Sequence, residues 1–447
     1  MSNNPQNEEQ IEAQLPEAAP QEKPPLSYRH LTLGLLLLVY IMNFLDRQLL
    51  SILLEPIKQE FELNDTQLGL LGGIAFAIFY VTFGLPIGRL ADRYNRTTIL
   101  AVCMALWSVM TVLCGYAVNF ITLMLARIGV AVGEAGGSPP SHSIISDLYP
   151  AEQRGTVLSV YSLGIPIGSM IALIGGGWLA DTFDWRTAFI ILGIPGLIYA
   201  LVFKLMATEP PRGYHSPKVN PEMPSISETL SFMVGQKSFL QLGVAAGLHA
   251  LAGYGLALYF PAFLVRHHEI TLTEAGLISG ILAGTAGGLA TFAGGFVADR
   301  MAKRTGNPKW YLLIPAYSSI VACPLMVATY LSNDLTLAIL LYIIPSLVGS
   351  MYLGPTFTLG QNLSGTRMRA LASSILLFIL NIIGLGLGPL VAGILSDSFR
   401  IWLDVDATRG LQLSLVVMAL VYLWSALHYF LALRHLPGDL ETAKAQG

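Results

Sequence analysis

The chain has 447 residues, of which 53% are hydrophobic and 12% are charged. An ordinary globular domain has about 25% charged residues, so this composition excludes a soluble globular protein and indicates one embedded in a membrane. The formal net charge is -3 and no basic cluster stands out in the sequence, which argues against nucleic acid as a partner.

Residues 1–26 are polar, acidic and contain proline. They lack the basic stretch, short apolar run and small-residue cleavage site of a signal peptide. We therefore expect a disordered tail, with the first helix directing insertion.

Twelve hydrophobic segments follow, each close to the roughly 20 residues that a membrane-spanning helix needs. We expect an all-α membrane protein made of two six-helix bundles, residues 27–206 and 237–434, joined by a linker at 207–236 and followed by a tail at 435–447. The predicted helix cores are Leu31–Leu54, Leu68–Leu90, Ile99–Val118, Phe120–Ile145, Thr156–Ala180, Ala188–Met206, Phe239–Leu264, Ala275–Ala298, Tyr311–Leu331, Leu335–Leu359, Ala370–Leu395 and Leu411–Leu433.

The basic residues predict the orientation of these helices. If both termini are cytoplasmic, 18 of the 25 Lys and Arg residues lie on the cytoplasmic side, because two (Arg47 and Arg127) fall within the membrane and only five lie on the opposite side: Lys58, Arg186, Arg266, Arg400 and Arg409. Cytoplasmic loops carry an excess of Lys and Arg, so both termini are predicted to be cytoplasmic.

Ionisable residues occur inside two of the apolar segments. Glu134 lies within the fourth segment, seven residues after Arg127, so both project from one face of a helix. Asp46 and Arg47 lie within the first, at a depth similar to that of Arg127. Charges at membrane depth are costly and mark working sites. We expect Glu134 to bind and release a coupled proton near the bilayer midplane, where carriers place such sites; the alternative is an ion-pair network with a purely structural role.

The carboxy-terminal half differs, since its seventh to eleventh helix cores contain no Asp, Glu, Lys or Arg. They offer a mainly apolar and aromatic wall that includes Tyr254, relieved by Thr356 and Asn381. A charged pocket facing an apolar one suits an amphiphile with a polar head and a hydrocarbon tail, although aromatic residues in helices also serve simply in packing. His249 is either a proton relay or a neutral histidine hydrogen-bonded between helices.

A short motif occurs twice. Gly88-Arg-Leu-Ala-Asp92-Arg93-Tyr-Asn-Arg96 follows the second segment, and Gly295-Phe-Val-Ala-Asp299-Arg300-Met-Ala-Lys303 follows the eighth, 207 residues later. Together with Glu209-Pro-Pro-Arg212 after the sixth segment, this pattern resembles the major facilitator superfamily over essentially all twelve helices. The resemblance implies a latch that closes the cytoplasmic ends of the helices, built here from Asp92, Arg93, Arg96, Asp147, Asp299 and Arg300.

A narrower resemblance rests on Asn43-Phe-Leu-Asp46-Arg47 and on Arg127-x6-Glu134-Ala-Gly-Gly-Ser-Pro-Pro. These residues are similar to those of bacterial Spinster proteins, a family that carries sphingosine 1-phosphate or lysophospholipids. The resemblance implies proton coupling through Asp46 and Glu134 and headgroup binding by Asn43, Arg47 and Arg127. Two alternatives remain open: a proton-coupled carrier of small organic anions or drugs, and a non-transporting receptor or scaffold.

The sequence contains no phosphate-binding Gly-x-x-x-x-Gly-Lys-Ser/Thr motif, zinc-site spacing or nucleophile with an adjacent base. We therefore expect a non-enzyme that uses no cofactor besides the coupled proton. Its expected partners are its substrate and membrane lipids, and it is expected to work as a monomer in a bacterial inner membrane.

Overall fold

A computed structural model describes residues 26–212, 226–365 and 368–445, and all regular structure within them is helical. Twelve helices or helix pairs in this part of the chain are long and apolar enough to cross a membrane, which confirms the twelve predicted segments. The elements are α2 (Leu26–Phe61), α3 (Asp65–Gly72), α4 (Ile74–Arg93), α5 (Arg96–Gly115), α6 (Phe120–Glu134), α7 (Ser138–Leu148), α8 (Ala151–Ser162), α9 (Gly164–Thr182), α10 (Trp185–Met206), α11 (Ile226–Gly235), α12 (Lys237–His268), α13 (Leu272–Thr305), α14 (Trp310–Leu331), α15 (Leu335–Val348), α16 (Leu353–Leu363), α17 (Arg369–Ile379), the π-helix η1 (Leu380–Leu387), α18 (Gly388–Trp402) and α19 (Ala407–Ala445).

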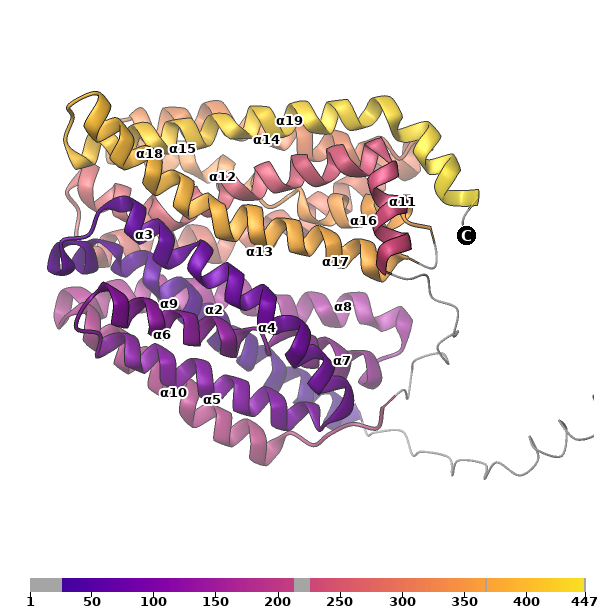
Figure 1. The fold of residues 1–447 in the computed structure, drawn as a ribbon, viewed down its shortest axis with the longest axis horizontal. Helices are drawn as coiled ribbons and strands as arrows, with labels where there is room; N and C mark the ends of the chain where they lie inside the picture. Colours follow the sequence, from indigo (N-terminus) through magenta and orange to yellow (C-terminus); the bar gives the residue numbers. More distant parts are fainter. Residues whose placement is uncertain (1–25, 213–225, 366–367, 446–447) are drawn as a thin grey trace, which may run out of the picture.

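One end of the molecule, here called the far end, carries six tight connections between consecutive spans. The opposite end, here called the linker end, carries both ends of the described chain and the linker (Figure 1). Each far-end connection includes a side chain that accepts a hydrogen bond from the backbone N–H three residues later and so satisfies a donor that the helix start leaves unpaired. These residues are Asn64, Asn119, Asp184, Thr271, Asp334 and Asp406.

Five of the spans are interrupted. The fourth span breaks at residues 135–137, directly after Glu134, and the tenth breaks at residues 349–352. The eleventh span passes through the π-helix η1 just before Pro389, which has no N–H to donate to the preceding turn. Such π segments are rare and occur mostly at functional sites, so the interruptions direct attention to the middle of the bundle.

The helices form two bundles, one from each half of the chain. In Figure 1, α2–α10 run from indigo to magenta and α12–α19 from rose to yellow, with α3 lying against α18 near the far end. The other main contacts between the halves are those of α9 with α13 and of α4 with η1. The fold is thus the predicted pair of six-helix bundles.

Two glycines allow α9 and α13 to cross closely at the far end. A Cβ added to Gly177 would lie 2.3 Å from the carbonyl oxygen of Leu272, and one added to Gly276 would lie 2.3 Å from that of Leu173. Any larger residue would force the helices apart, because real Cβ atoms do not approach so closely. The two halves therefore meet backbone to backbone at this crossing.

Buried charges also join the halves at the far end. Asp65, 1% exposed at the start of α3, accepts hydrogen bonds from Arg266 of α12 through both carboxylate oxygens at 3.0 Å. It also accepts from Lys58 at 2.6 Å and from Ser396 at 2.6 Å. Arg266 in turn donates to Glu55 at 2.5 Å. One arginine from the carboxy-terminal half is therefore held by two acids of the amino-terminal half.

The first turns of α3 and α13 are each capped by an aspartate from the other half of the chain. Asp397 of α18 accepts from the backbone N–H groups of Asp65 and Thr66 at 3.2 and 2.7 Å. Asp181 of α9 accepts from those of Leu272 and Thr273 at 3.3 and 2.6 Å. Since the first acid lies in the carboxy-terminal half and the second in the amino-terminal half, each half caps a helix of the other.

Arg96 organises the linker end. Its guanidinium is 1% exposed and contacts Asp147, Glu209 at 2.6 Å and the carbonyl oxygen of Pro210 at 3.0 Å. Arg212 donates to the carbonyl oxygens of Asp92, Ala91 and Tyr94 at the end of α4. The start of the linker is thus fixed to the amino-terminal half.

The predicted linker, residues 207–236, contains the helix α11. Residues 213–225 lie outside the described residues, as do residues 1–25 of the expected tail. The predicted tail from 435 begins as helix instead, because α19 continues without a break to Ala445. Pro437 lies inside α19, and the polar residues after it still favour helix.

Candidate functional site

Arg47 and Glu134 form an ion pair in the middle of the amino-terminal bundle. The Arg47 Nε and Nη2 atoms lie 2.8 and 2.6 Å from Glu134 Oε2. Arg47 comes from α2, and Glu134 is the last residue of α6, where the fourth span breaks. The Glu134 side chain is fully buried and that of Arg47 is 11% exposed. The arginine is therefore the member of the pair that solvent or a ligand can reach.

Arg127 and Asp46 lie beside this pair without forming a second one. Arg127 Nη1 donates to the backbone carbonyl oxygen of Asp46 at 3.2 Å, and no hydrogen bond links their side chains in the described chain. Arg127 is 2% exposed and Asp46 is 1% exposed. The contact confirms that these residues share a depth in the bundle. Of the four membrane charges, Arg47 and Glu134 are the two that form an ion pair in the described chain.

Aromatic rings lie near both guanidinium groups, three near that of Arg47 and one near that of Arg127. The Arg47 Cζ atom lies 4.9 Å from the ring centroids of Phe44 and Tyr80, and 5.3 Å from that of Phe76. The Arg127 Cζ atom is also 5.3 Å from the Phe76 centroid. A cation over a ring face is attracted by the ring's electron density, more strongly where water is excluded. The Phe76 ring of α4 therefore lies near both guanidinium groups.

The remaining residues predicted for substrate binding fall into different settings. Asn43 is 3% exposed and lies on α2 near Gly137, at the break in the fourth span. Tyr254 of α12 is 38% exposed and lies in the neighbourhood of Arg47. Thr356 is fully buried beside the Tyr429 hydroxyl at 3.3 Å, and Asn381 donates to the Leu377 carbonyl oxygen at 2.8 Å. The structure thus brings Asn43 and Tyr254 to the charged residues, whereas Thr356 and Asn381 contact their own half.

His249 links helices of the carboxy-terminal half. Its Nδ1 lies 2.9 Å from the Ser319 hydroxyl, and its Nε2 lies 2.7 Å from the carbonyl oxygen of Gly349. Gly349 begins the break in the tenth span, and the imidazole also stacks on Tyr352 with centroids 4.0 Å apart. A histidine hydrogen-bonded between helices was one of the two sequence readings, and this is the arrangement observed.

The residues expected to form the latch fall into several settings at the linker end of the described chain. Arg96 contacts Asp147, as the resemblance implied, but Asp92 and Arg93 are exposed. Asp299 accepts from the Tyr311 hydroxyl at 2.8 Å, and the Arg300 Cζ atom lies 6.0 Å from the Phe296 centroid. These contacts lie within single halves, while the far-end network crosses between them.

Two groups of residues were missed by sequence reasoning. One is the far-end network around Asp65 and Arg266, whose only signal was opposite charge at the ends of two spans. The other is the set of polar side chains on α5 beside Asp46, including Trp107 and Thr111. Trp and Thr are common in membrane-spanning helices, so the sequence alone did not indicate that Trp107 and Thr111 lie beside Asp46.

Comparison with known proteins agrees with this geometry. Residues 36–386 match the sequence profile of the Major Facilitator Superfamily. The chain belongs to this superfamily. It is therefore a membrane transporter and not an enzyme, as the sequence predicted.

Several superfamily members resemble the whole chain. An MFS-type efflux pump of Mycolicibacterium smegmatis is 34% identical over 407 residues, covering 89% of this chain and 91% of the pump. Protein spinster homolog 1 of Mus musculus is 28% identical, covering 89% of this chain and 79% of its own length. A crystal structure of a bacterial homologue of the human lysosomal transporter Spinster, described as inward-facing and unoccupied, has a TM-score of 0.84 at 32% identity and covers 93% of this chain and 99% of its own. The predicted resemblance to Spinster proteins is confirmed.

Proposed function

We propose that this protein is a proton-coupled secondary transporter that moves an amphiphilic lipid with an anionic head, such as a lysophospholipid or a sphingoid phosphate, by alternating access. The observation that carries the proposal is the buried Arg47–Glu134 pair at a helix break in mid-bundle. Carriers bind substrates and coupling ions at such discontinuous helices near the bilayer midplane.

The geometry suggests how proton and substrate would be linked. Glu134 Oε2 accepts hydrogen bonds from Nε and Nη2 of the Arg47 guanidinium, and Arg47 is the more exposed member of the pair. An anionic head approaching Arg47 must compete with the Glu134 carboxylate for the same donors. Protonating Glu134 removes that competitor, because a neutral carboxyl accepts from arginine far more weakly. Proton binding at Glu134 thereby favours anion binding at Arg47, and the linkage is reciprocal.

The amphiphilic substrate is supported by the contrast between the halves. Asp46, Arg47, Arg127 and Glu134 lie in the amino-terminal bundle, whereas Tyr254 belongs to the carboxy-terminal bundle, whose seventh to eleventh helix cores contain no Asp, Glu, Lys or Arg. A lipid would place its head among the arginines and its tail along this wall. The similarity to proteins named spinster favours the same class.

A proton-coupled carrier of small organic anions or drugs is the second candidate. A hexuronate transporter of Bacillus subtilis is 30% identical over 61% of this chain and 65% of its own length, and the mycobacterial relative is named as an efflux pump. A thermal-shift comparison of lysophosphatidic acid with glucuronate separates the candidates, since a ligand of the native state raises its apparent stability. Stabilisation by glucuronate alone would favour the second candidate.

The orientation completes the proposal. Of the 22 Lys and Arg residues that the structure describes, 15 lie at the linker end; the exceptions are Arg47, Arg127, Lys58, Arg186, Arg266, Arg400 and Arg409. We place this end in the cytoplasm of a bacterial cell. Because the far end is joined across the halves, the described conformation is then inward-facing, and the monomer contains every group that the mechanism uses.

Glu134→Gln in proteoliposomes tests proton coupling. We expect the variant to lose substrate accumulation driven by a proton gradient but to retain exchange of labelled for unlabelled substrate, which needs no net proton movement. Glu60→Gln is a matched control, because Glu60 also pairs with an arginine, Arg186 at 2.5 Å, but does so at the far end. Gradient-driven accumulation at the wild-type rate in Glu134→Gln would refute the proposed coupling.

A further inference from the structure

Buried polar atoms without a hydrogen-bond partner are concentrated around the four membrane charges. Twelve such side-chain atoms occur in the part of the chain that the structure describes, and six of them belong to α2, α5 and α6 in this one region. Native proteins pair nearly all of their buried polar groups, so a cluster of six requires an explanation. The six atoms are Asn43 Nδ2, Asp46 Oδ1, Trp107 Nε1, Ser108 Oγ, Arg127 Nε and Glu134 Oε1.

These atoms belong to neighbouring side chains. The Asp46 carboxylate lies beside Trp107. A Cβ built on Gly196 of α10 would be 2.3 Å from Ser108 Oγ and 3.9 Å from Asp46 Oδ2. A Cβ built on Gly137 would be 3.4 Å from Asn43 Nδ2 and 3.9 Å from the Trp107 ring. Trp107 thus lies between the Asp46 carboxylate and the helix break that follows Glu134.

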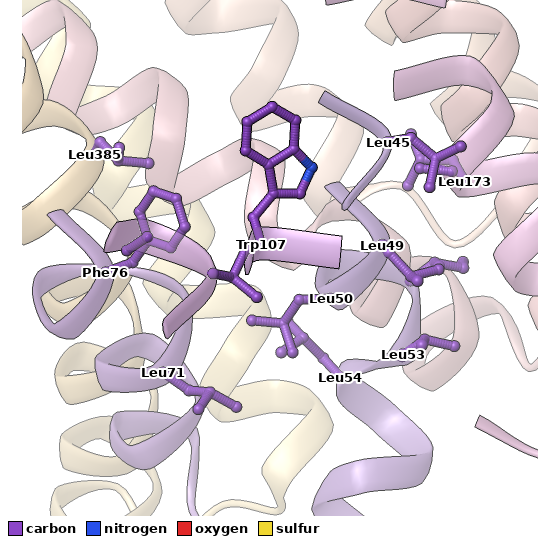
Figure 2. Packing of buried hydrophobic residues seen from close by; sticks show 14 of the residues in the cluster. Leu45, Leu49, Leu50, Leu53, Leu54, Leu71, Phe76, Trp107, Leu173 and Leu385 are labelled. Carbon is purple, nitrogen blue, oxygen red and sulfur yellow. The ribbon is translucent and has the colours of Figure 1, made fainter. Parts of the chain in front are cut away.

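The setting of the cluster is otherwise apolar. Trp107 is fully buried in the same hydrophobic cluster as Phe76, Leu49 and Leu50 (Figure 2). These leucines offer no hydrogen-bonding groups, so the side chains near the six atoms that can pair with them are one another and the Thr111 hydroxyl beside Asp46. A small polar molecule between them would provide what the side chains do not.

The types of the six atoms indicate which molecule fits. Asn43 Nδ2, Trp107 Nε1 and Arg127 Nε can only donate, the ionised carboxylate oxygens of Asp46 and Glu134 can only accept, and Ser108 can do both. Water both donates and accepts, and buried waters typically make about three hydrogen bonds to such groups. A metal cation would suit the acids but would be repelled by the Arg127 guanidinium.

We propose that ordered water occupies this cluster and connects Asp46 to Glu134, with Trp107 and Ser108 as positioning residues for proton transfer. The proposal rests on the proton coupling proposed above. In the transfer, the O–H bond of protonated Asp46 breaks as its proton moves to a water oxygen. That water gives another of its protons to Glu134 Oε1, so Asp46 becomes a carboxylate, Glu134 becomes a carboxylic acid and the water is regenerated.

Gly196→Ala tests the proposal by placing a methyl group against Ser108 Oγ and beside Asp46. The matched control is Gly193→Ala, one turn away on the same helix. The three atoms nearest to a Cβ added there are Val112 Cγ2 at 2.9 Å, the Val112 backbone nitrogen at 3.1 Å and the Thr111 methyl carbon at 3.2 Å, and none of them is one of the six. Ser108→Ala is the second variant, since it removes the hydroxyl without adding volume.

Two measurements are made on each variant. In proteoliposomes, we expect gradient-driven transport to slow about tenfold in Gly196→Ala, equivalent to about 1.4 kcal/mol in the barrier, while substrate exchange continues. In infrared difference spectra between acidic and neutral pH, we expect water O–H bands that shift in H₂¹⁸O. Those bands should be lost in Gly196→Ala, altered in Ser108→Ala and retained in Gly193→Ala.

Equal transport in Gly196→Ala, Ser108→Ala and Gly193→Ala would overturn the water connection, even if water bands were present. Absence of isotope-sensitive water bands in the wild type would overturn it as well. Both failures are distinct from failure of the proposed function, which Glu134→Gln tests separately. If Glu134→Gln is uncoupled while the Gly196 and Ser108 variants behave like the control, proton coupling stands and the water route is wrong.

Discussion

Replacing Arg266 with glutamine is expected to open the far end of the protein. Arg266 is the residue of the carboxy-terminal half that binds both Asp65 and Glu55. These bonds exist only while the two halves meet at that end. Their loss therefore destabilises the described conformation relative to one in which the halves have separated there, and leaves the helices themselves intact.

The size of the effect follows from the contacts that remain. Removing one partner of a buried ion pair costs about 3–5 kcal/mol. Asp65 keeps Lys58 at 2.6 Å and Ser396 at 2.6 Å after the change, so we take about 2–3 kcal/mol, which is about a 30-fold to 150-fold change in the ratio of the two states. A minor state populated at about 1% would then rise to at least about 20%.

Spin labels at Val118 and Ile401 can measure this shift. Both positions are at the far end, in opposite halves, and are 74% and 75% exposed. All three native cysteines are buried, which simplifies selective labelling. We expect Arg266→Gln to add a population at longer distance. Arg186→Gln is the control, because Arg186 binds Glu60 and the Ala117 carbonyl oxygen within one half at the same end.

A wild-type distance distribution in Arg266→Gln would refute this reasoning. So would an equal change in Arg186→Gln, because it would show that loss of any far-end charge has the same effect. In either outcome, the free energy that closes this end would come from its other contacts between the halves: the packing of α9 with α13 and of α3 with α18, and the helix caps by Asp181 and Asp397.

Two further predictions concern close packing and anion binding. Gly177→Ala should lower the melting temperature by an amount equivalent to about 1–3 kcal/mol of overpacking, because its methyl group would lie 2.3 Å from the Leu272 carbonyl oxygen. Gly175→Ala, whose added Cβ would have its nearest neighbour at 3.8 Å, should be tolerated. Equal melting temperatures in the two variants would show that the helix crossing can relax. In calorimetric titrations with lysophosphatidic acid, Arg127→Lys should weaken binding, because lysine keeps the charge but lacks the planar fork of donors. Arg127→Ala should nearly abolish binding, and the affinity of the wild type should rise as the pH falls. Equal affinities in all three proteins would show that Arg127 does not bind the lipid.

The charged centre could be predicted in part from the sequence. A charge inside an apolar segment is visible without any structure, and Asp46, Arg47, Arg127 and Glu134 were found in that way. The pairing was not visible, because a seven-residue spacing places Arg127 and Glu134 on one face of a helix but does not say which helix supplies the partner. The observed partner of Glu134 is Arg47, from a helix 87 residues earlier in the chain.

Other features left weaker signals. Asp65 and Arg266 lie at the ends of spans, where charged residues are common, so their contact depends on how the two halves meet. The breaks after Glu134 and Val348 involve glycines that would equally permit close helix packing. Hydropathy and repeats could therefore predict the twelve spans and the two bundles, whereas the interruptions and the interface required the assembled fold.

The confinement of the intramembrane charges to one bundle has a consequence for how such carriers diversify. Substitutions along the uncharged wall around Tyr254 can reshape the space for a cargo without altering the acids and arginines opposite. Under the proposed mechanism, proton coupling and substrate selectivity can then change independently, one in each half of the chain. The same proton-coupling residues could thus be kept in relatives that carry very different substrates.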